Sequence, residues 1–280
     1  MFNKAYIFGL GMIGGSIALS LKKNKIAKYI YAFDKDRKSL LYAKKNRIIN
    51  DYDKKFNYLK EADLIVICTP INAYNSILKR IKSSRNDKCI ITDVGSTKKS
   101  IMQSATKVFG NKNNCFVGSH PLAGKEKSGV KNACPNLFNN AVAIITSSQV
   151  TDKIALKKIK LFWKKIGCNI ELLSPELHDV IMSETSHIPH LISYSLVNSI
   201  YRSKNVKNIA RFTGGGFEDF ARIARSNPIM WSDICQHNKK NILLSLDSFI
   251  KELKELKIKI RKNDYASLRS LFNKTKNKLS

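Results

Sequence analysis

A glycine-rich turn near the start of the chain places the strongest constraint on the fold. Gly9, Gly11 and Gly14 have the spacing G-x-G-x-x-G, after a short apolar run and before a stretch with helical spacing. In such a strand–turn–helix unit, the first glycine permits the tight turn, the second lets the backbone approach a pyrophosphate, and the third lets the helix pack on the strand. The helix N-terminus, including the N–H groups of Met12 and Ile13, attracts the negative charge. The chain is therefore predicted to begin with a dinucleotide-binding unit.

An acidic residue completes this motif. Asp34 lies 20 residues after Gly14, at the end of the next predicted strand. A carboxylate at this place accepts hydrogen bonds from adenosine ribose hydroxyls and repels a 2′-phosphate, so NAD is favoured over NADP as the cofactor. The neighbouring Lys35 and Arg37 weaken this preference, because a cation there can hold the phosphate.

Strands and helices alternate through the first 174 residues. Strands are predicted at residues 4–9, 29–34, 64–69, 89–93, 115–119, 141–146 and 169–173. Helices are predicted between them, at residues 12–23, 37–45, 72–82, 98–108 and 151–166. After Pro175 only helices are predicted, at residues 176–201, 217–225, 231–260 and 265–279. We therefore predict an α/β protein in which a Rossmann-type domain with a mostly parallel sheet (residues 1–174) precedes an all-helical domain (residues 175–280).

Three polar segments lie where predicted strands end, which is where open α/β sheets bind their ligands. Thr69 and Pro70 follow the third strand, and an ordinary turn is an equally good interpretation of this pair. Asp-Val-Gly-Ser-Thr-Lys at residues 93–98 and Gly-Ser-His-Pro at residues 118–121 follow the next two strands. His120, placed on a shaped loop, can take a proton from a hydroxyl while hydride leaves the same carbon.

The helical half carries a second polar set. His187 and His190 lie three residues apart around Pro189, which predicts a kink that directs His190 across the cleft. No metal is expected, because neither a carboxylate nor a third histidine accompanies them at a suitable spacing. Asp219 and Arg222 lie one helical turn apart and can pair, and Arg222 is a candidate for bidentate recognition of a carboxylate. From the spacing alone, a solvated salt bridge is an equal alternative.

An apolar stripe runs along the helix predicted at residues 231–260. Its members recur at helical spacing: Ile234, Ile242, Leu246, Phe249, Leu253, Leu256 and Ile260. Such a stripe packs either within the helical domain or against a second subunit. We favour a homodimer formed through this domain.

The formal net charge of +29 admits two interpretations. A basic surface is typical of nucleic-acid binding, whereas lysines spread along the whole chain indicate a lysine-rich proteome. No nucleic-acid-binding motif accompanies the charge, so we expect no nucleic-acid partner. A basic regulator that senses NAD or binds nucleic acid stays open as an alternative from a different class.

The cysteines and the hydropathy pattern bear on the compartment. No C-x-x-C pair is present, and several of the six cysteines, such as Cys68 and Cys89, lie in apolar runs that predict buried thiols. Such thiols fit a reducing environment. Neither a secretory signal nor a membrane-spanning stretch is recognisable, so we expect a cytoplasmic protein without membrane association.

Taken together, these motifs resemble those of the prephenate dehydrogenases across nearly the whole chain. The shared motifs also include His178-Asp179, Ser-His-Ile-Pro-His ending at His190, and Asn-Pro-x-Met-Trp ending at Trp231. The resemblance implies oxidative decarboxylation of prephenate to 4-hydroxyphenylpyruvate, with hydride transfer to NAD, in tyrosine biosynthesis. Arogenate dehydrogenases share the fold and the motifs, and they are the nearest alternative.

The resemblance also implies roles for individual residues. His120 matches the base that accepts the proton of the ring C4 hydroxyl, and Ser96 matches a residue that hydrogen-bonds this histidine and the hydroxyl near the nicotinamide. Arg222 matches the residue that pairs with a prephenate carboxylate. The other matches are a second polar substrate contact, a gating acid near the entrance, and three residues that line or support the pocket: His190, Glu126, Gly215, Asp219 and Trp231, in that order.

Overall fold

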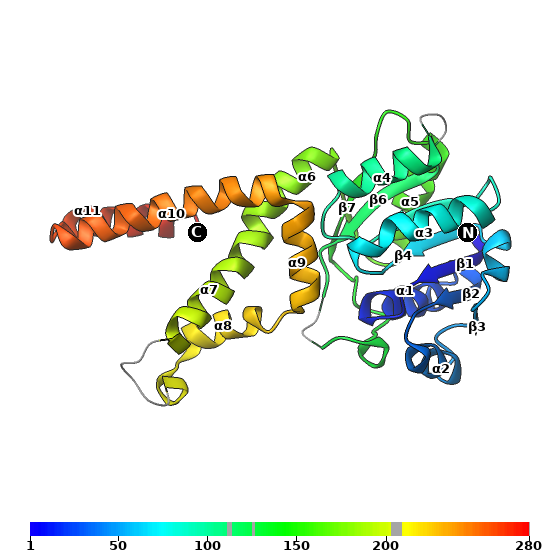
Figure 1. Cartoon of the computed structure of the whole chain (residues 1–280), viewed down its shortest axis with the longest axis horizontal. Helices are drawn as coiled ribbons and strands as arrows, with labels where there is room; N and C mark the ends of the chain where they lie inside the picture. The colour runs from blue at the N-terminus through cyan, green and yellow to red at the C-terminus, as the bar shows by residue number, and fades with distance from the viewer. Residues whose placement is uncertain (111–113, 125–126, 203–208, 280) are drawn as a thin grey trace.

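An eight-stranded sheet forms the N-terminal part of the molecule (Figure 1). The computed structural model describes residues 1–110, 114–124, 127–202 and 209–279. The strand order is β3-β2-β1-β4-β5-β6-β7-β8, and only the β6–β7 pair is antiparallel. The strands are β1 (Phe2–Phe8), β2 (Ala27–Phe33), β3 (Asp51–Tyr52), β4 (Leu64–Ile67), β5 (Ile90–Asp93), β6 (Phe116–Pro121), β7 (Val142–Thr146) and β8 (Asn169–Leu173).

Helices cover both faces of this sheet. They are α1 (Met12–Lys23), α2 (Arg37–Lys45), α3 (Tyr74–Ser84), α4 (Lys99–Phe109) and α5 (Lys153–Lys165). Successive side chains of β1 point to opposite faces, so they enter two apolar cores. Ala5 and Ile7 pack into the core that contains α1 and α5, whereas Tyr6 and Phe8 pack into the core that contains α3 and α4. Burial on both faces explains the continuously apolar sequences of the central strands.

Six helices follow the sheet in the described part of the chain. They are α6 (Pro175–Met182), α7 (Ile188–Arg202), α8 (Gly215–Ala224), α9 (Pro228–His237), α10 (Lys239–Arg261) and α11 (Tyr265–Asn277). α6 and α9 both begin with a side-chain cap followed by proline, Ser174-Pro175 and Asn227-Pro228, which is a favourable helix start. In Figure 1, α10 and α11 project away from the sheet, with α7 and α8 diverging from them. None of the described helices is long and apolar enough to cross a membrane.

The predicted fold class is confirmed, with local differences in single elements. The short edge strand β3 was not predicted, because two residues carry no recognisable periodicity. The helix predicted at residues 176–201 contains a π-helical turn, Ser183–His187, which ends two residues before Pro189, whose ring cannot continue regular helical bonding. The helix predicted at residues 231–260 was wrong as a single helix, because it is interrupted at Asn238.

Candidate active site

The glycine turn between β1 and α1 has the geometry of a phosphate-binding loop. Gly9 has a φ of 91°, and a Cβ atom there would lie 2.7 Å from the carbonyl oxygen of Cys68. A Cβ atom on Gly14 would lie 2.0 Å from the carbonyl oxygen of Gly9. Gly11 differs from both, because no described atom lies within 4 Å of a Cβ atom placed on it. Gly9 and Gly14 are thus required by close contacts within the backbone, whereas Gly11 leaves space for a ligand.

The groups around this turn fit a dinucleotide. No side chain caps the N-terminus of α1, so the N–H groups of its first turn, which begins at Met12 and Ile13, are directed at the open space. Asp34, at the end of β2, accepts hydrogen bonds from the N–H groups of Leu10 (2.5 Å) and Asp36 (2.7 Å). Its carboxylate therefore holds the turn and keeps lone pairs for ribose hydroxyls.

The loop after β4 borders the glycine turn. The Cγ2 atom of Thr69 would lie 3.1 Å from a Cβ atom on Gly9. Its hydroxyl oxygen is buried and has no hydrogen-bond partner among the described residues. The adjacent Pro70 is exposed. A buried hydroxyl without a partner is costly, so it suits a polar ligand at this place.

His120 lies within β6 rather than on a loop after it. The strand continues to Pro121, and His120 pairs in register with Ile144 of β7. The predicted loop position was wrong, because the antiparallel β7 prolongs the strand. Burial, assisted by the nearby side chains of His178, Lys98 and His187, holds the pKa of His120 well below its usual value. The imidazole is therefore neutral near pH 7, as a proton acceptor must be.

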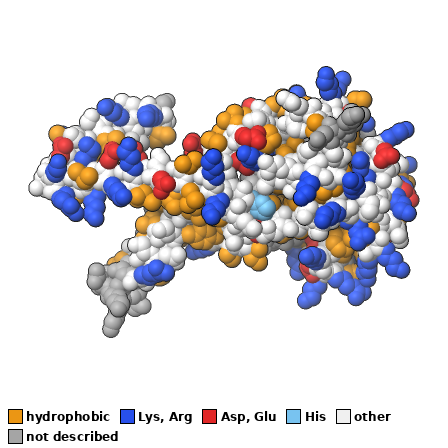
Figure 2. All heavy atoms as spheres, turned by 45° about the horizontal axis from the view of Figure 1, so that its top comes forward, with side chains coloured by type: hydrophobic (Ala, Val, Ile, Leu, Met, Phe, Trp, Pro, Cys, Tyr) orange, Lys and Arg blue, Asp and Glu red, His pale blue; other side chains and the backbone are white. Residues whose placement is uncertain are grey.

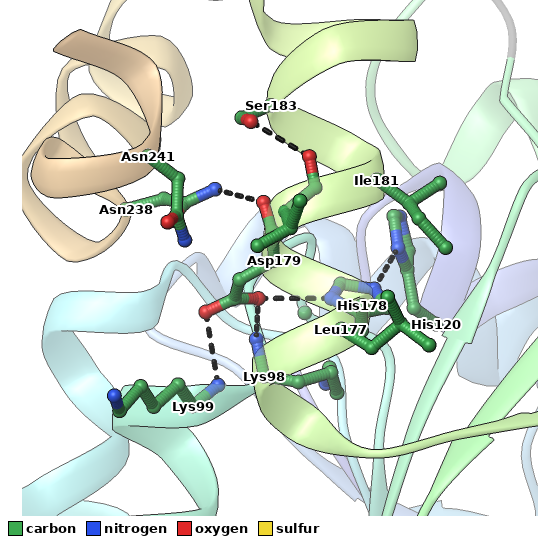
Figure 3. A network of polar contacts seen from close by, with 12 residues as sticks. Lys98, Lys99, His120, Leu177, His178, Asp179, Ile181, Ser183, Asn238 and Asn241 are labelled. Carbon is green, nitrogen blue, oxygen red and sulfur yellow. Dashed lines mark hydrogen bonds and ion pairs between the residues drawn. The ribbon is translucent and has the colours of Figure 1, made fainter. Parts of the chain in front are cut away.

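A chain of three side chains leads from His120 to a carboxylate (Figure 3). His120 Nδ1 lies 2.9 Å from His178 Nε2, and His178 Nδ1 lies 2.8 Å from Asp179 Oδ1. The backbone N–H groups of Lys98 and Lys99 donate to the two oxygens of Asp179, at 2.7 and 3.1 Å. The sequence motifs include His178 and Asp179, but no role followed from them, because the contact with His120 spans 58 residues.

A buried ion pair shapes the backbone around His120. Lys98 Nζ binds the carboxylate of Asp93, and both side chains are fully buried. Asp93 also accepts the N–H groups of Gly95 (2.8 Å) and Ser119 (2.9 Å). Burial lowers the pKa of Lys98, and the adjacent carboxylate of Asp93 opposes this shift. The pair thus fixes the end of β5 against the strand that carries His120, a function that the motif alone did not indicate.

Ser96 lies in the loop between Asp93 and Lys98 and is half-buried. Within the described structure, no hydrogen bond joins its hydroxyl to His120. Its contact with this base and with the substrate hydroxyl therefore stays a prediction.

The substrate-side residues cluster in part at a cleft between the sheet domain and the helices. The cleft has a volume of about 1010 Å³ and is lined by Gly124, Lys127, Lys131, Asn132, Ala133, Cys134, His190, Arg222, Ile223 and Ser226. Two of the predicted substrate contacts, His190 and Arg222, are therefore together. Lys127 and Lys131 add positive charge that the motifs did not reveal.

His190 and Trp231 form one unit beside this cleft. Their rings stack with centroids 3.9 Å apart, and Trp231 is buried. His190 Nδ1 lies 2.9 Å from the carbonyl oxygen of Ser186, so it carries a proton and donates it. The Nε2 atom of the neutral ring is then an acceptor. Trp231 thus supports the ring of His190.

The remaining predicted residues lie farther out. Asp219 and Arg222 form the expected pair on α8, 3.7 Å apart and largely exposed. Gly215, at the start of α8, is exposed, and neither it nor Asp219 lines the cleft. Glu126 lies outside the described residues. Among the described residues, no group of three or more His, Cys, Asp or Glu side chains could hold a metal ion.

A Rossmann-type sheet with an open glycine turn, a buried neutral histidine and a basic cleft defines a nucleotide-dependent dehydrogenase. Residues 17–172 match the nucleotide-binding domain of prephenate dehydrogenase, and residues 174–274 match the dimerization domain of the same family. The chain belongs to the prephenate dehydrogenase family.

Individual relatives agree with this assignment. The chain is 39% identical over 279 residues to prephenate dehydrogenase of Bacillus subtilis (strain 168), covering 99% of this chain and 75% of that protein. The crystal structure of prephenate dehydrogenase from Aquifex aeolicus, in complex with hydroxyphenyl propionate and NAD+, has a TM-score of 0.93 and 33% identity, covering 99% of this chain and 97% of that one. The crystal structure of Synechocystis arogenate dehydrogenase has a TM-score of 0.83 and 26% identity, with 98% of each chain covered.

Proposed function

We propose that this protein is an NAD-dependent prephenate dehydrogenase, which converts prephenate to 4-hydroxyphenylpyruvate in tyrosine biosynthesis. The observation that carries the proposal is His120, a buried neutral imidazole in a sheet that also carries the open glycine turn. Membership in the family supplies the substrate class.

The chemistry follows from a base and two carboxylates. His120 takes the proton of the C4 hydroxyl of prephenate, while the hydroxyl of Ser96 holds the same oxygen in place. NAD, when bound, supplies the acceptor for the hydride that leaves C4. The resulting ketone is a vinylogous β-keto acid, so the ring carboxylate leaves as CO2, the ring becomes aromatic, and the proton returns to the oxygen. Aromatisation makes the reaction effectively irreversible.

The cofactor is held by the glycine turn. Gly9, Gly11 and Gly14 bring the backbone to the pyrophosphate, with the N–H groups of Met12 and Ile13 at the helix start. Asp34 would hold the ribose hydroxyls, and the loop of Thr69 and Pro70 would contribute the buried, unpartnered hydroxyl of Thr69 as a further polar contact. The carboxylate of Asp34 disfavours the 2′-phosphate of NADP.

The substrate enters the basic cleft. Arg222, Lys127 and Lys131 line this cleft and attract a dianion such as prephenate. His190, held by Trp231, makes the second polar contact, and Glu126 acts as the gating acid. Asp219 pairs with Arg222 on α8, and Gly215 supports the pocket from the start of the same helix.

Residues 1–174 form the nucleotide-binding domain in this account, and residues 175–280 form the substrate-binding and dimerisation domain. A homodimer is supported by the match to the family's dimerization domain. A cytoplasmic location is supported by the six cysteines, all of which carry free thiols. Lys and Arg side chains are scattered over the face shown in Figure 2, which favours small anionic ligands over a nucleic-acid partner.

Arogenate is the alternative substrate, and the likeness to Synechocystis arogenate dehydrogenase favours it as the second candidate. Arogenate carries an amino group where prephenate has the side-chain keto group. A steady-state assay of reduced-cofactor formation with prephenate or arogenate, each with NAD or NADP, distinguishes the four pairings. The proposal predicts the highest kcat/KM for prephenate with NAD. A preference for arogenate would replace the substrate but keep the roles of His120 and Arg222, and no turnover with any pairing would overturn the proposed function.

A further inference from the structure

We propose that His178 and Asp179 are a positioning pair, which sets the tautomer of His120 so that its Nε2 atom is the base. This inference rests on the proposed function, because it assigns a role within the same reaction. His120 belongs to β6 of the nucleotide-binding part, whereas His178 and Asp179 belong to α6 of the helical part. The base is therefore completed only where the two parts meet.

The hydrogen-bond partners of Asp179 determine the protonation of its carboxyl group. Oδ1 accepts the N–H of Lys98 at 2.7 Å and lies 2.8 Å from His178 Nδ1, while Oδ2 accepts the N–H of Lys99 at 3.1 Å. Both backbone donors stand at the start of α4, where the helix dipole favours a negative charge. Donors thus surround the carboxyl group, so it is an ionised acceptor and His178 Nδ1 must carry a proton.

The tautomer of His178 fixes that of His120. A neutral His178 with its proton on Nδ1 has only a lone pair on Nε2. His120 Nδ1 lies 2.9 Å from that atom, so it must be the donor. The proton on His120 Nδ1 leaves Nε2 with a lone pair, which is the form that a general base requires.

Burial keeps both rings neutral before reaction. Burial lowers the pKa of His178, although Asp179 and Asp93 oppose this shift, and Lys98 acts in the same direction as burial. His120 faces His178, Lys98 and His187, each of which disfavours a second positive charge. When His120 accepts the substrate proton, the carboxylate of Asp179 stabilises the new cation through His178, as in other base–carboxylate relays.

A third contact ties the pair to the rest of the helical part. Asn238, at the break between α9 and α10, donates its side-chain amide to the carbonyl oxygen of Asp179 at 2.7 Å. It also lies 3.2 Å from His187 Nδ1. Asn238 contacts the backbone of Asp179 but none of the side-chain atoms that set the tautomers of His178 and His120. It therefore offers a matched control for a merely structural role.

The test compares His178→Phe, His178→Gln and Asn238→Ala in the full-length protein. Phenylalanine removes the acceptor for His120 Nδ1, so kcat should fall by about 10²-fold or more, with little change in KM for prephenate or in NAD affinity. Glutamine places an amide oxygen near the position of Nε2 and should restore part of kcat. Asn238→Ala should lower the melting temperature but leave the pH profile of kcat unchanged.

A second readout does not depend on turnover. The chain has five histidines, so the ¹⁵N chemical shifts of the imidazoles can be assigned by single substitutions. The proposal expects the Nδ1–H tautomer for His120 in the parent protein and its loss in His178→Phe. An Nε2–H tautomer in the parent, or a His178→Phe variant with unchanged kcat and pH profile, would overturn the proposal. Failure of the parent protein to turn over prephenate would instead overturn the proposed function.

Discussion

At the scale of single residues, the proposed base and the proposed substrate-binding cation depend on opposite environments. In the proposed reaction His120 is the base, because burial disfavours its charged form and keeps it neutral where an exposed histidine would be partly protonated. Arg222 is the proposed substrate contact because it is exposed in a basic cleft and an arginine is always charged. The glycines act through the space that they leave and through the contacts that a side chain would make.

Gly11 and Gly14 form a matched pair for a prediction. Gly14→Ala brings a Cβ atom into the carbonyl of Gly9, so the free energy of unfolding should fall by about 1–3 kcal/mol. Gly11→Ala meets no described atom, so stability should be unchanged, while the Kd for NAD should rise about tenfold, or by about 1.4 kcal/mol. Denaturant unfolding and calorimetric NAD titration measure the two effects. Equal stability losses in both variants would show that the turn is not organised in this way.

Arg222→Ala removes the cation that is proposed to pair with a carboxylate. We expect KM for prephenate to rise at least tenfold, while KM for NAD changes less than twofold, because a charge-assisted contact contributes about 1.5–3 kcal/mol. Initial-rate measurements with each substrate varied in turn provide the comparison. An unchanged KM for prephenate would remove Arg222 from the substrate site.

At the scale of secondary-structure elements, the sequence predicted the elements that local signals mark, but it did not predict the long-range contacts between them. The bounds of α1, α2 and β8 agree with the prediction to the residue, and in the structure α1 and α2 begin at local features, the glycine turn and the Asp36 cap. The contact of His120 with His178, and that of Lys98 with Asp179 across 81 residues, depend on how α6 docks on α4. No spacing in the sequence encodes such docking.

The break in the long helix has a similar cause. Residues 231–260 have continuous helical spacing, yet Asn238 leaves the helical conformation and binds Asp179. The tertiary contact therefore outweighs the local preference for a continuous helix. The sequence predicted candidate residues for the site but not the contacts between them, since the motifs contained His178 and Asp179 but gave no sign of their contact with His120.

The π-helical turn before α7 supplies a pH-dependent prediction. Burial lowers the pKa of His187, on this turn, from 6.5 to about 4. As the pH falls, His187 is therefore protonated in the unfolded chain before it is protonated in the folded chain. The free energy of unfolding should fall by about 1.4 kcal/mol per pH unit from pH 6.5 to 4, with no further loss from this group below pH 4. His187→Gln should make the slope shallower by one proton in denaturant unfolding between these pH values. An identical slope in the variant would contradict the assignment.

At the scale of the whole molecule, the projecting helices need a partner surface. Ile242 is the one fully buried residue of α10 among those described, whereas Leu244, Leu253 and Ile260 are about half exposed or more. Figure 2 shows hydrophobic side chains at the surface of the helical part as well as on the sheet domain. Apolar patches of this kind mark protein–protein contacts, and the match to a dimerization domain supports the proposal that the partner is a second copy.

The dimer gives a prediction at this scale. Sedimentation equilibrium of the 31.7 kDa chain should show a dimer at micromolar concentration. Leu244→Glu should shift it towards the monomer, because a charge cannot be buried there without a partner. Leu41→Glu, at an exposed leucine of α2 far from these helices in sequence, is the control and should stay dimeric. A monomeric parent protein would exclude the proposed assembly.

The most direct test of the central claim is the product balance of the parent protein and of His120→Asn with prephenate and NAD. We expect one reduced NAD and one 4-hydroxyphenylpyruvate for each prephenate consumed, and a kcat for His120→Asn that is lower by about 10²–10⁴-fold while NAD still binds. Reduced cofactor formed without 4-hydroxyphenylpyruvate, or a His120→Asn variant within a few-fold of the parent, would contradict the account.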